Sequence, residues 1–289
     1  MAYYTSADWK LLSKTTQTTY RGIIDRFRAQ HGDKPLRRLQ AQHVRAMMDA
    51  RADTPAAANN LLKVLRAMMR FAVDRAMITI DPTANVKPLR YKSDGFHTWT
   101  EDEIARFDAR WPLGTQERLA KDLLLYTAQR SSDVRTMGLQ HVRGGVVKVK
   151  QQKTGTSLEI GLHQALRASL AARPTNQLTF VTTPSGEPYT AAGFGNWFRE
   201  AARKAGLPVG VSAHGLRKAA ARRLAEAGCT ASEIAAITGH RTLKEVSRYT
   251  QAADQRTMAD AAMLKIGGGT QGEQNLSNLG NGLDNAGVK

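Results

Sequence analysis

The chain has 289 residues, of which 42% are hydrophobic, and it carries 42 Lys/Arg against 25 Asp/Glu, a formal net charge of +17. This length allows about two domains with cores of their own, and the hydrophobic fraction argues against global disorder. The sequence has no apolar run near the ~20 residues of a membrane span, which disfavours a membrane protein. It has no start typical of a secretory signal and a single cysteine, Cys229. These features disfavour a disulfide-stapled secreted module and a cysteine-based zinc domain.

Positive charge is spread along the chain and is not confined to a tail. Residues 1–95 carry 17 Lys/Arg against 8 Asp/Glu, and residues 96–265 carry 24 against 15. A basic excess of this size favours a polyanionic partner, usually nucleic acid and less often an anionic membrane. Simple solubility is the alternative explanation, because a solvated basic surface has the same composition.

Residues 15–77 are predicted to form helices only. Gly32 and Pro35 interrupt the first helical stretch, and Thr54 followed by Pro55 is typical of a helix start. The clearest apolar stripe at steps of three and four consists of Leu61, Leu62, Leu65, Met68, Met69 and Ala72. The first domain is therefore predicted to be an all-α bundle. Residues 81–98, with prolines, a glycine and a run of basic side chains, have the composition of a linker.

A second domain is predicted to begin where Thr100 and Glu103 form a capping-box pattern. Alternating stretches at 146–150 and 158–160, joined by Lys153-Thr154-Gly155, predict a β-hairpin. Further short helices are expected at 163–172, 190–205, 214–227, 231–238 and 253–265. The expected fold is mainly α with a small antiparallel β-sheet.

The sequence lacks several common catalytic signatures. It has no GxxxxGK[ST] phosphate loop, no GxGxxG after a strand, no HExxH and no Cys/His cluster at zinc spacing. The remaining groups that bind phosphate or move protons are Arg130, Lys153, His214, Arg217, His240 and Tyr249. Two arginines can hold the non-bridging oxygens of a phosphodiester, and a lysine can protonate a leaving alkoxide. A tyrosine hydroxyl can attack phosphorus if a base or a positive site offsets its pKa of about 10.

In this order and spacing, these residues resemble those of the tyrosine recombinases, also called phage-type integrases. The stretch Thr127-Ala-Gln-Arg130-Ser-Ser-Asp133-Val-Arg-Thr-Met-Gly-Leu139 resembles the family's first arginine motif. His214-x-x-Arg217 matches the second, and Thr238-Gly239-His240 with Arg248-Tyr249 matches the closing motif. Each piece occurs by chance when taken alone, and the specificity lies in their combination on a basic chain.

The resemblance extends over nearly the whole chain. It implies a helical core-type DNA-binding domain at 1–90, a linker at 91–98 and a catalytic domain at 99–266, followed by a Gly/Asn-rich tail at 267–289 that we expect to be disordered. Many phage integrases carry a further small N-terminal domain for distant arm sites. Here the first helix is expected to start by about Thr15, which leaves no room for one. The element therefore uses simple core sites, or the chain is truncated.

The resemblance also implies a role for the nucleophile and its immediate neighbours. Tyr249 would attack the scissile phosphate, form a 3′-phosphotyrosyl link and free a 5′-hydroxyl. Arg130 and Arg217 would hold the phosphate, and His214 would accept or relay the tyrosine proton. Because the covalent intermediate stores the bond energy, neither ATP nor a metal would be required, and no cofactor is expected.

Three further residues receive roles in the same way. His240 would hydrogen-bond a non-bridging oxygen. Lys153 would be the general acid for the leaving hydroxyl, with Lys148 and Lys150 as the alternatives nearby. Asp133 would support the site by orienting a neighbouring arginine or histidine.

The function implied is that of a site-specific DNA recombinase of a phage or other mobile element. It would act in the cytoplasm as a homo-tetramer on two double-stranded DNA core attachment sites, with accessory DNA-bending or directionality factors as further candidate partners and no membrane partner. A type IB-like topoisomerase, which uses the same chemistry as a monomer, is one alternative. A catalytically silent DNA-binding regulator with the same fold is another.

Overall fold

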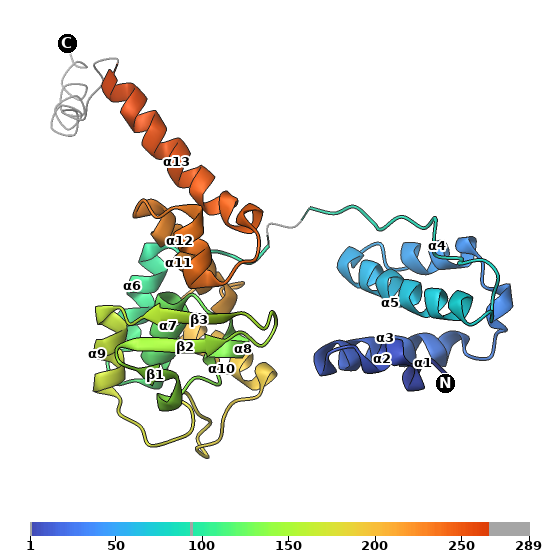
Figure 1. Ribbon diagram of the computed structural model, residues 1–289, viewed down its shortest axis with the longest axis horizontal. Coiled ribbons are helices and arrows are strands. Elements are labelled where there is room, and N and C mark those ends of the chain that lie inside the picture. The colour runs from blue at the N-terminus through green and yellow to red at the C-terminus, as the bar shows by residue number, and fades with distance from the viewer. Residues whose placement is uncertain (1, 93–94, 266–289) are drawn as a thin grey trace, which may run out of the picture. The chain divides into compact units, whose positions relative to one another are not determined.

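The computed structural model describes residues 2–92 and 95–265 (Figure 1). The chain divides into two compact units, Met1–Ser93 and Asp94–Lys289. Helices dominate both, and the described strands form one three-stranded antiparallel sheet, so the predicted fold class is confirmed. The predicted tail at 267–289 lies outside the described residues. The assignment of DNA binding to one unit and catalysis to the other stays a prediction.

Every regular element within residues 2–92 of the N-terminal unit is a helix, as expected for an α-bundle. Its elements are α1 (Ala2–Thr5), α2 (Ala7–Lys10), α3 (Lys14–His31), the 3-10 helix η1 (Leu36–Arg38), α4 (Ala41–Asp49) and α5 (Pro55–Asp74). The expected start of the first helix near Thr15 is wrong, because α1 and α2 precede α3. Leu62, Leu65 and Met69 of the predicted stripe are buried in this unit, so the stripe is core.

The linker between the units is shorter than the 81–98 stretch that has linker composition. Val86 is buried in the N-terminal core, and Asn59 brackets Leu89, donating from Nδ2 to its carbonyl at 2.9 Å and accepting from its amide at 2.8 Å. On the other side, Trp99 is fully buried in the second unit and donates from Nε1 to the Ser212 carbonyl at 2.9 Å. Proline and basic residues at 81–89 therefore belong to a packed segment.

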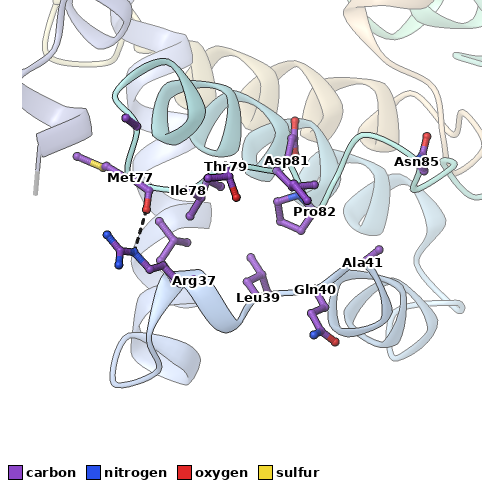
Figure 2. Close-up of a pocket in the computed structure, with 13 residues that line it drawn as sticks. Arg37, Leu39, Gln40, Ala41, Met77, Ile78, Thr79, Asp81, Pro82 and Asn85 are labelled. Atoms are coloured by element: carbon purple, nitrogen blue, oxygen red, sulfur yellow. Dashed lines mark hydrogen bonds between the residues drawn. The ribbon is translucent and has the colours of Figure 1, made fainter.

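The N-terminal unit also contains a pocket of about 630 Å³ between η1 and residues 76–85 (Figure 2). Arg37 closes one end by donating from Nε to the Met77 carbonyl at 3.3 Å. Asp81, Pro82 and Asn85 line the opposite part. None of the predicted site residues lines this pocket, so it is separate from the candidate chemistry.

The C-terminal unit combines helices with the sheet. Its elements are α6 (Glu101–Arg110), α7 (Gln116–Thr127), α8 (Ser131–Val134), the 3-10 helix η2 (Leu139–His141), β1 (Val142–Arg143), β2 (Val146–Lys150), β3 (Ser157–Gly161), α9 (Gln164–Ala172), α10 (Ala191–Lys204), α11 (Ala213–Glu226), α12 (Ala231–Thr238) and α13 (Leu243–Lys265). The predicted capping box is present, with Thr100 Oγ1 accepting from the Glu103 amide and Glu103 accepting from the Thr100 amide.

The predicted hairpin is correct, with Val149 opposite Leu158. Val147 and Ile160 face the core, while Lys148 and Glu159 face solvent. β1 adds an edge strand that the sequence did not indicate, because two residues are too short for a periodic signal.

α11 is the central helix of the C-terminal unit. Leu216 and Ala219 are fully buried within it, and the helix packs on α7, α12 and α13 (Figure 1). At its start, an added Cβ on Gly215 would lie 2.2 Å from the His97 carbonyl. Only glycine lets α11 approach the 97–99 segment this closely. This packing fixes the start of the helix, and with it the backbone positions of His214 and Arg217.

α13 is one continuous helix of 23 residues, Leu243–Lys265. The predicted break after Tyr249, with a separate helix over 253–265, is therefore wrong. No glycine or proline interrupts this stretch, so the hydrogen-bond ladder can continue. Val246, fully buried, docks the first turns in a cluster with α11 and α12 residues, and Figure 1 shows the rest running away from those helices.

Candidate active site

Arg130 stands at a sharp turn between two helices. α7 ends at Ala128, whose φ of 53° is in the left-handed region, and fully buried Gln129 follows. Arg130 then serves as N-cap residue of α8. Its Nη1 donates to Gln151 Oε1 at 3.0 Å, so the guanidinium is held by a neutral acceptor.

Arg217 lies inside α11, three residues after His214, and is only 3% exposed. Nη1 donates to the Ala128 carbonyl at 2.5 Å, and Nη2 contacts His240 Nε2 at 3.1 Å. Burial, followed by the charge of Arg130, lowers the pKa of Arg217 to about 10. The two arginines therefore share one electrostatic environment, and neutral groups hold both.

The hydrogen bonds of His240 define its tautomer. Thr238 Oγ1 donates to the Ile234 carbonyl at 2.7 Å, so the same oxygen accepts from His240 Nδ1 at 2.8 Å. Arg217 can only donate, so His240 Nε2 accepts from it. Burial and the Arg217 charge lower the pKa of His240 to about 4. The ring is therefore neutral at pH 7, with its proton on Nδ1.

His214 occupies the first turn of α11, on the exposed side. Its ring lies 4.5 Å from the Phe96 ring, centroid to centroid. Loss of solvation lowers its pKa, and so do the charges of Arg217, Arg130 and Lys153, among other cations. His214 is therefore within electrostatic range of the two arginines and the lysine, and their charge disfavours its protonated form.

Lys153 is exposed in the turn between β2 and β3. Of the alternatives, Lys148 pairs with Glu159 at 2.6 Å. Among the three lysines, only Lys153 acts on the pKa of His214, which favours it as the lysine of the site.

Asp133 is almost fully buried and supports the turn that bears Lys153. Its Oδ1 accepts from the Gln152 backbone amide at 2.8 Å. The expectation that it orients an arginine or histidine through direct contact is therefore not met. Its charge reaches Arg217 only at longer range, where it works to raise the pKa of that residue.

Tyr249 lies on α13 and is half-buried. Its side chain packs against the cluster of Ala221, Ala225, Ile234 and Val246. The phenol also acts on the pKa of Arg217, so it is within electrostatic range of the buried guanidinium. All six predicted catalytic residues are thus brought into one region by α8, the β2–β3 turn, α11, the α12–α13 junction and α13.

The described part of the chain holds neither a cluster of metal ligands nor a membrane-spanning helix. No group of three or more His, Cys, Asp or Glu side chains there is arranged to hold a metal ion. No described helix is long and apolar enough to cross a membrane.

Comparison with known proteins places this arrangement in a family. The family model described as "Phage integrase family" matches residues 100–256, more than half of the chain. The chain belongs to the phage integrase family. Among curated members, this phage integrase is 34% identical over 131 residues to a shufflon-specific DNA recombinase of Escherichia coli, covering 44% of this chain and 33% of the relative. It is 25% identical over 203 residues to the integrase of Escherichia phage HK022, covering 66% of this chain and 57% of that integrase.

Solved structures show the same fold. A lambda integrase (residues 75–356) dimer bound to a COC' core site superposes with a TM-score of 0.76 at 23% identity, covering 86% of this chain and 93% of that one. The Tn1549 transposon integrase in complex with circular intermediate DNA superposes with a TM-score of 0.71 at 17% identity, covering 86% of this chain and 94% of that one. Our phage integrase spans between one third and three fifths of the length of the two curated relatives.

Proposed function

We propose that this chain is a site-specific DNA recombinase that cleaves one strand through a 3′-phosphotyrosyl intermediate on Tyr249. The observation that carries the proposal is the pair of guanidinium groups, Arg130 and Arg217, which neutral acceptors hold beside a neutral His240. Among the described side chains, no carboxylate forms an ion pair with either arginine, and such positive charge is suited to a phosphodiester, whose negative charge grows in the transition state. The recombinase and integrase names of the curated relatives support the same reaction.

The proposed step balances without a co-reactant. The Tyr249 hydroxyl oxygen attacks phosphorus and forms the Tyr–O–P bond, while the bond from phosphorus to the 5′-oxygen breaks. His214 takes the phenol proton, and Lys153 gives a proton to the leaving 5′-oxygen. Return of a 5′-hydroxyl from a partner strand reverses the step and restores a DNA phosphodiester.

His240 requires a change of protonation to take its proposed role. In the structure its Nε2 accepts from Arg217 and so has no proton to offer a phosphate oxygen. A bound phosphate adds a negative charge next to the ring, which favours the imidazolium form. We propose that Nε2 then gains the proton with which it donates to a non-bridging oxygen.

Double-stranded DNA is the proposed partner. The two units are both basic, with 17 Lys/Arg against 8 Asp/Glu in residues 1–95 and 24 against 15 in 96–265. The lambda and Tn1549 integrase structures contain DNA. The core-site duplex for the experiments below carries the repeated sequence at the two ends of the genomic element that encodes this chain.

The first prediction tests the reaction itself. The chain, purified and incubated with a nicked core-site duplex in EDTA without nucleotide, should form a covalent protein–DNA adduct, because the residues assigned to the step supply every proton and charge. The adduct is measured as a slow band on a denaturing gel.

Four outcomes distinguish the candidate functions. Full adduct formation in EDTA supports the proposal, and a strict magnesium requirement for cleavage contradicts it. Absence of the adduct despite tight DNA binding favours a DNA-binding regulator. Relaxation of supercoiled plasmid without site preference favours a type IB-like topoisomerase.

A tetramer on two duplexes is the proposed active assembly. One lambda integrase structure is a tetramer bound to a Holliday junction. In this chain, Ala262, Met263 and Leu264 near the end of α13 are exposed. Three adjacent exposed apolar or small residues at the end of a projecting helix support docking on a neighbouring subunit. The sequence also predicts a small apolar face here, made by Met258, Ala261, Ala262 and Ile266 at helical spacing. The side chains of Met258 and Ala261 are not described, and Ile266 lies outside the described residues.

The second prediction tests this docking. Deleting 253–289 should leave binding to a single core site intact but abolish the complex of two duplexes, because α13 then ends before its exposed segment. Deleting only 267–289 is the matched control and should have little effect. Native-gel shifts with both truncations measure this, and a normal two-duplex complex from the longer deletion would exclude docking through α13.

A further inference from the structure

Gln151 is a buried glutamine that makes every hydrogen bond its side chain can form. It directly follows β2, is 1% exposed and precedes the turn that bears Lys153. Oε1 accepts from Arg130 Nη1 at 3.0 Å and from Thr154 Oγ1 at 2.6 Å. Nε2 donates to Gln129 Oε1 at 2.7 Å and to the Thr238 carbonyl at 2.8 Å. Two donors and two acceptor positions exhaust the capacity of a primary amide.

The partners leave no choice in how the amide is oriented. Arg130 can only donate, so the atom that faces it is the oxygen, and the Thr238 carbonyl can only accept, so the atom that faces it is the nitrogen. Gln129 uses its own Nε2 on the Thr127 and Ile237 carbonyls. It therefore turns its oxygen toward Gln151. A rotated amide would lose its bonds to Arg130, Gln129 and Thr238, and a buried polar group without partners is costly.

Three of the four side-chain bonds of Gln151 lead to different parts of the proposed site. Arg130 is contacted directly, and Thr154 is the residue next to Lys153. Thr238 also holds the Nδ1 proton of His240. The backbone of Gln151 closes the base of the turn, accepting from the Gly155 amide and donating to the Thr156 carbonyl, both at 2.8 Å.

Gly239 gives independent evidence that this packing is tight. It ends α12 with a φ of 69°, which glycine adopts without strain. A Cβ added there would lie 2.5 Å from Gln151 Nε2. Glycine is therefore needed before His240 for two reasons: it allows the backbone turn, and it leaves space for the Gln151 amide.

We propose that Gln151 is a positioning residue, which sets Arg130, the Lys153 turn and the His240 junction relative to one another through one buried amide. This inference rests on the proposed strand-cleavage function and extends it. It assigns no contact with DNA to Gln151. Its effect on the reaction passes through the three groups that it holds.

The test begins with Gln151→Met, which keeps the side-chain length and removes all four bonds. We expect core-site binding close to parental and adduct formation slower by on the order of 10²-fold, the cost of displacing a catalytic group by about 1 Å. Gln140→Met is the matched control, because Gln140 is exposed and makes one bond, to the Leu178 carbonyl at 3.1 Å. This control should cleave at the parental rate.

A sulfur-substituted core-site duplex separates positioning from mere support of the fold. With sulfur in place of the bridging 5′-oxygen, the leaving thiolate needs no proton, so a defect that acts through Lys153 is relieved. Lys153→Ala should recover on this substrate. Gln151→Met should recover in part, because its displaced Arg130 still slows cleavage. An equal loss on both substrates would contradict the link to the lysine turn.

Thr154→Val covers the case in which Gln151→Met does not fold. It leaves the other three bonds of the amide in place and removes the bond between the amide and the turn, together with the bond that Thr154 Oγ1 accepts from Thr156 Oγ1 within the turn. We expect a smaller loss than for Gln151→Met, relieved fully by the sulfur substrate; parental cleavage by Thr154→Val or Gln151→Met on the ordinary duplex would overturn the inference. If the parental chain itself forms no adduct, the proposed function fails instead.

Discussion

Tyr249→Phe is expected to bind the core-site duplex as tightly as the parental chain and to form no covalent adduct. The substitution removes only the oxygen that attacks phosphorus. The ring remains, so its packing against Val246 and Ile234 is kept, and α13 should stay docked. Gel shift measures the binding, and a denaturing gel measures the adduct.

Tyr189→Phe is the matched control for this loss. Tyr189 lies in the same unit, is 8% exposed and stacks on Trp197 with a centroid distance of 5.2 Å. Removing its hydroxyl should leave adduct formation unchanged. If purified Tyr249→Phe still became attached to DNA, another residue would be the nucleophile.

Arg217→Lys should slow cleavage by about 10²–10³-fold, the usual range for a lost transition-state contact. Arg217 holds the Ala128 carbonyl and His240 with two nitrogens of one planar group. Lysine offers a single charged nitrogen on a flexible stem and cannot keep both contacts while facing a phosphate. Because Arg217→Lys keeps the positive charge, the slower cleavage would measure the effect of the side-chain geometry.

Arg223→Lys provides the comparison on the same helix. Arg223 binds Glu101 through two nitrogens, so a lysine would weaken this pair as well. The pair includes none of the proposed catalytic residues, so cleavage should stay at the parental rate. Single-turnover cleavage with saturating protein measures both variants. Parental rates from Arg217→Lys would remove that residue from the site.

Local patterns predicted much of the fold. The capping box at Thr100 and the β2–β3 hairpin depend on neighbours in sequence, and both are correct. Helices α1 and α2 were missed because four residues are too few to show a period. The break proposed after Tyr249 had no glycine or proline to cause it, and α13 runs through.

The site was predictable only where residue type signals chemistry. Arg130, His214 and Tyr249 stood out because arginine, histidine and tyrosine in a spaced motif suggest phosphoryl chemistry. The groups that hold them did not, because the Ala128 carbonyl and the Gln151 amide carry no such signal. Their partners are also distant in the chain, 89 residues apart for Arg217 and Ala128, so only the folded structure brings them together.

The buried charge of Arg217 also affects the stability of the protein without DNA. A cation that is 3% exposed and held by a carbonyl and an imidazole reduces the free energy of unfolding of the DNA-free form. A bound phosphate would add a counter-charge next to Arg217. Each tenfold rise in free DNA concentration above its Kd then adds about 1.4 kcal/mol to that free energy. The DNA-free form should therefore unfold at a lower temperature than the DNA-bound form, which thermal denaturation with and without a duplex would measure.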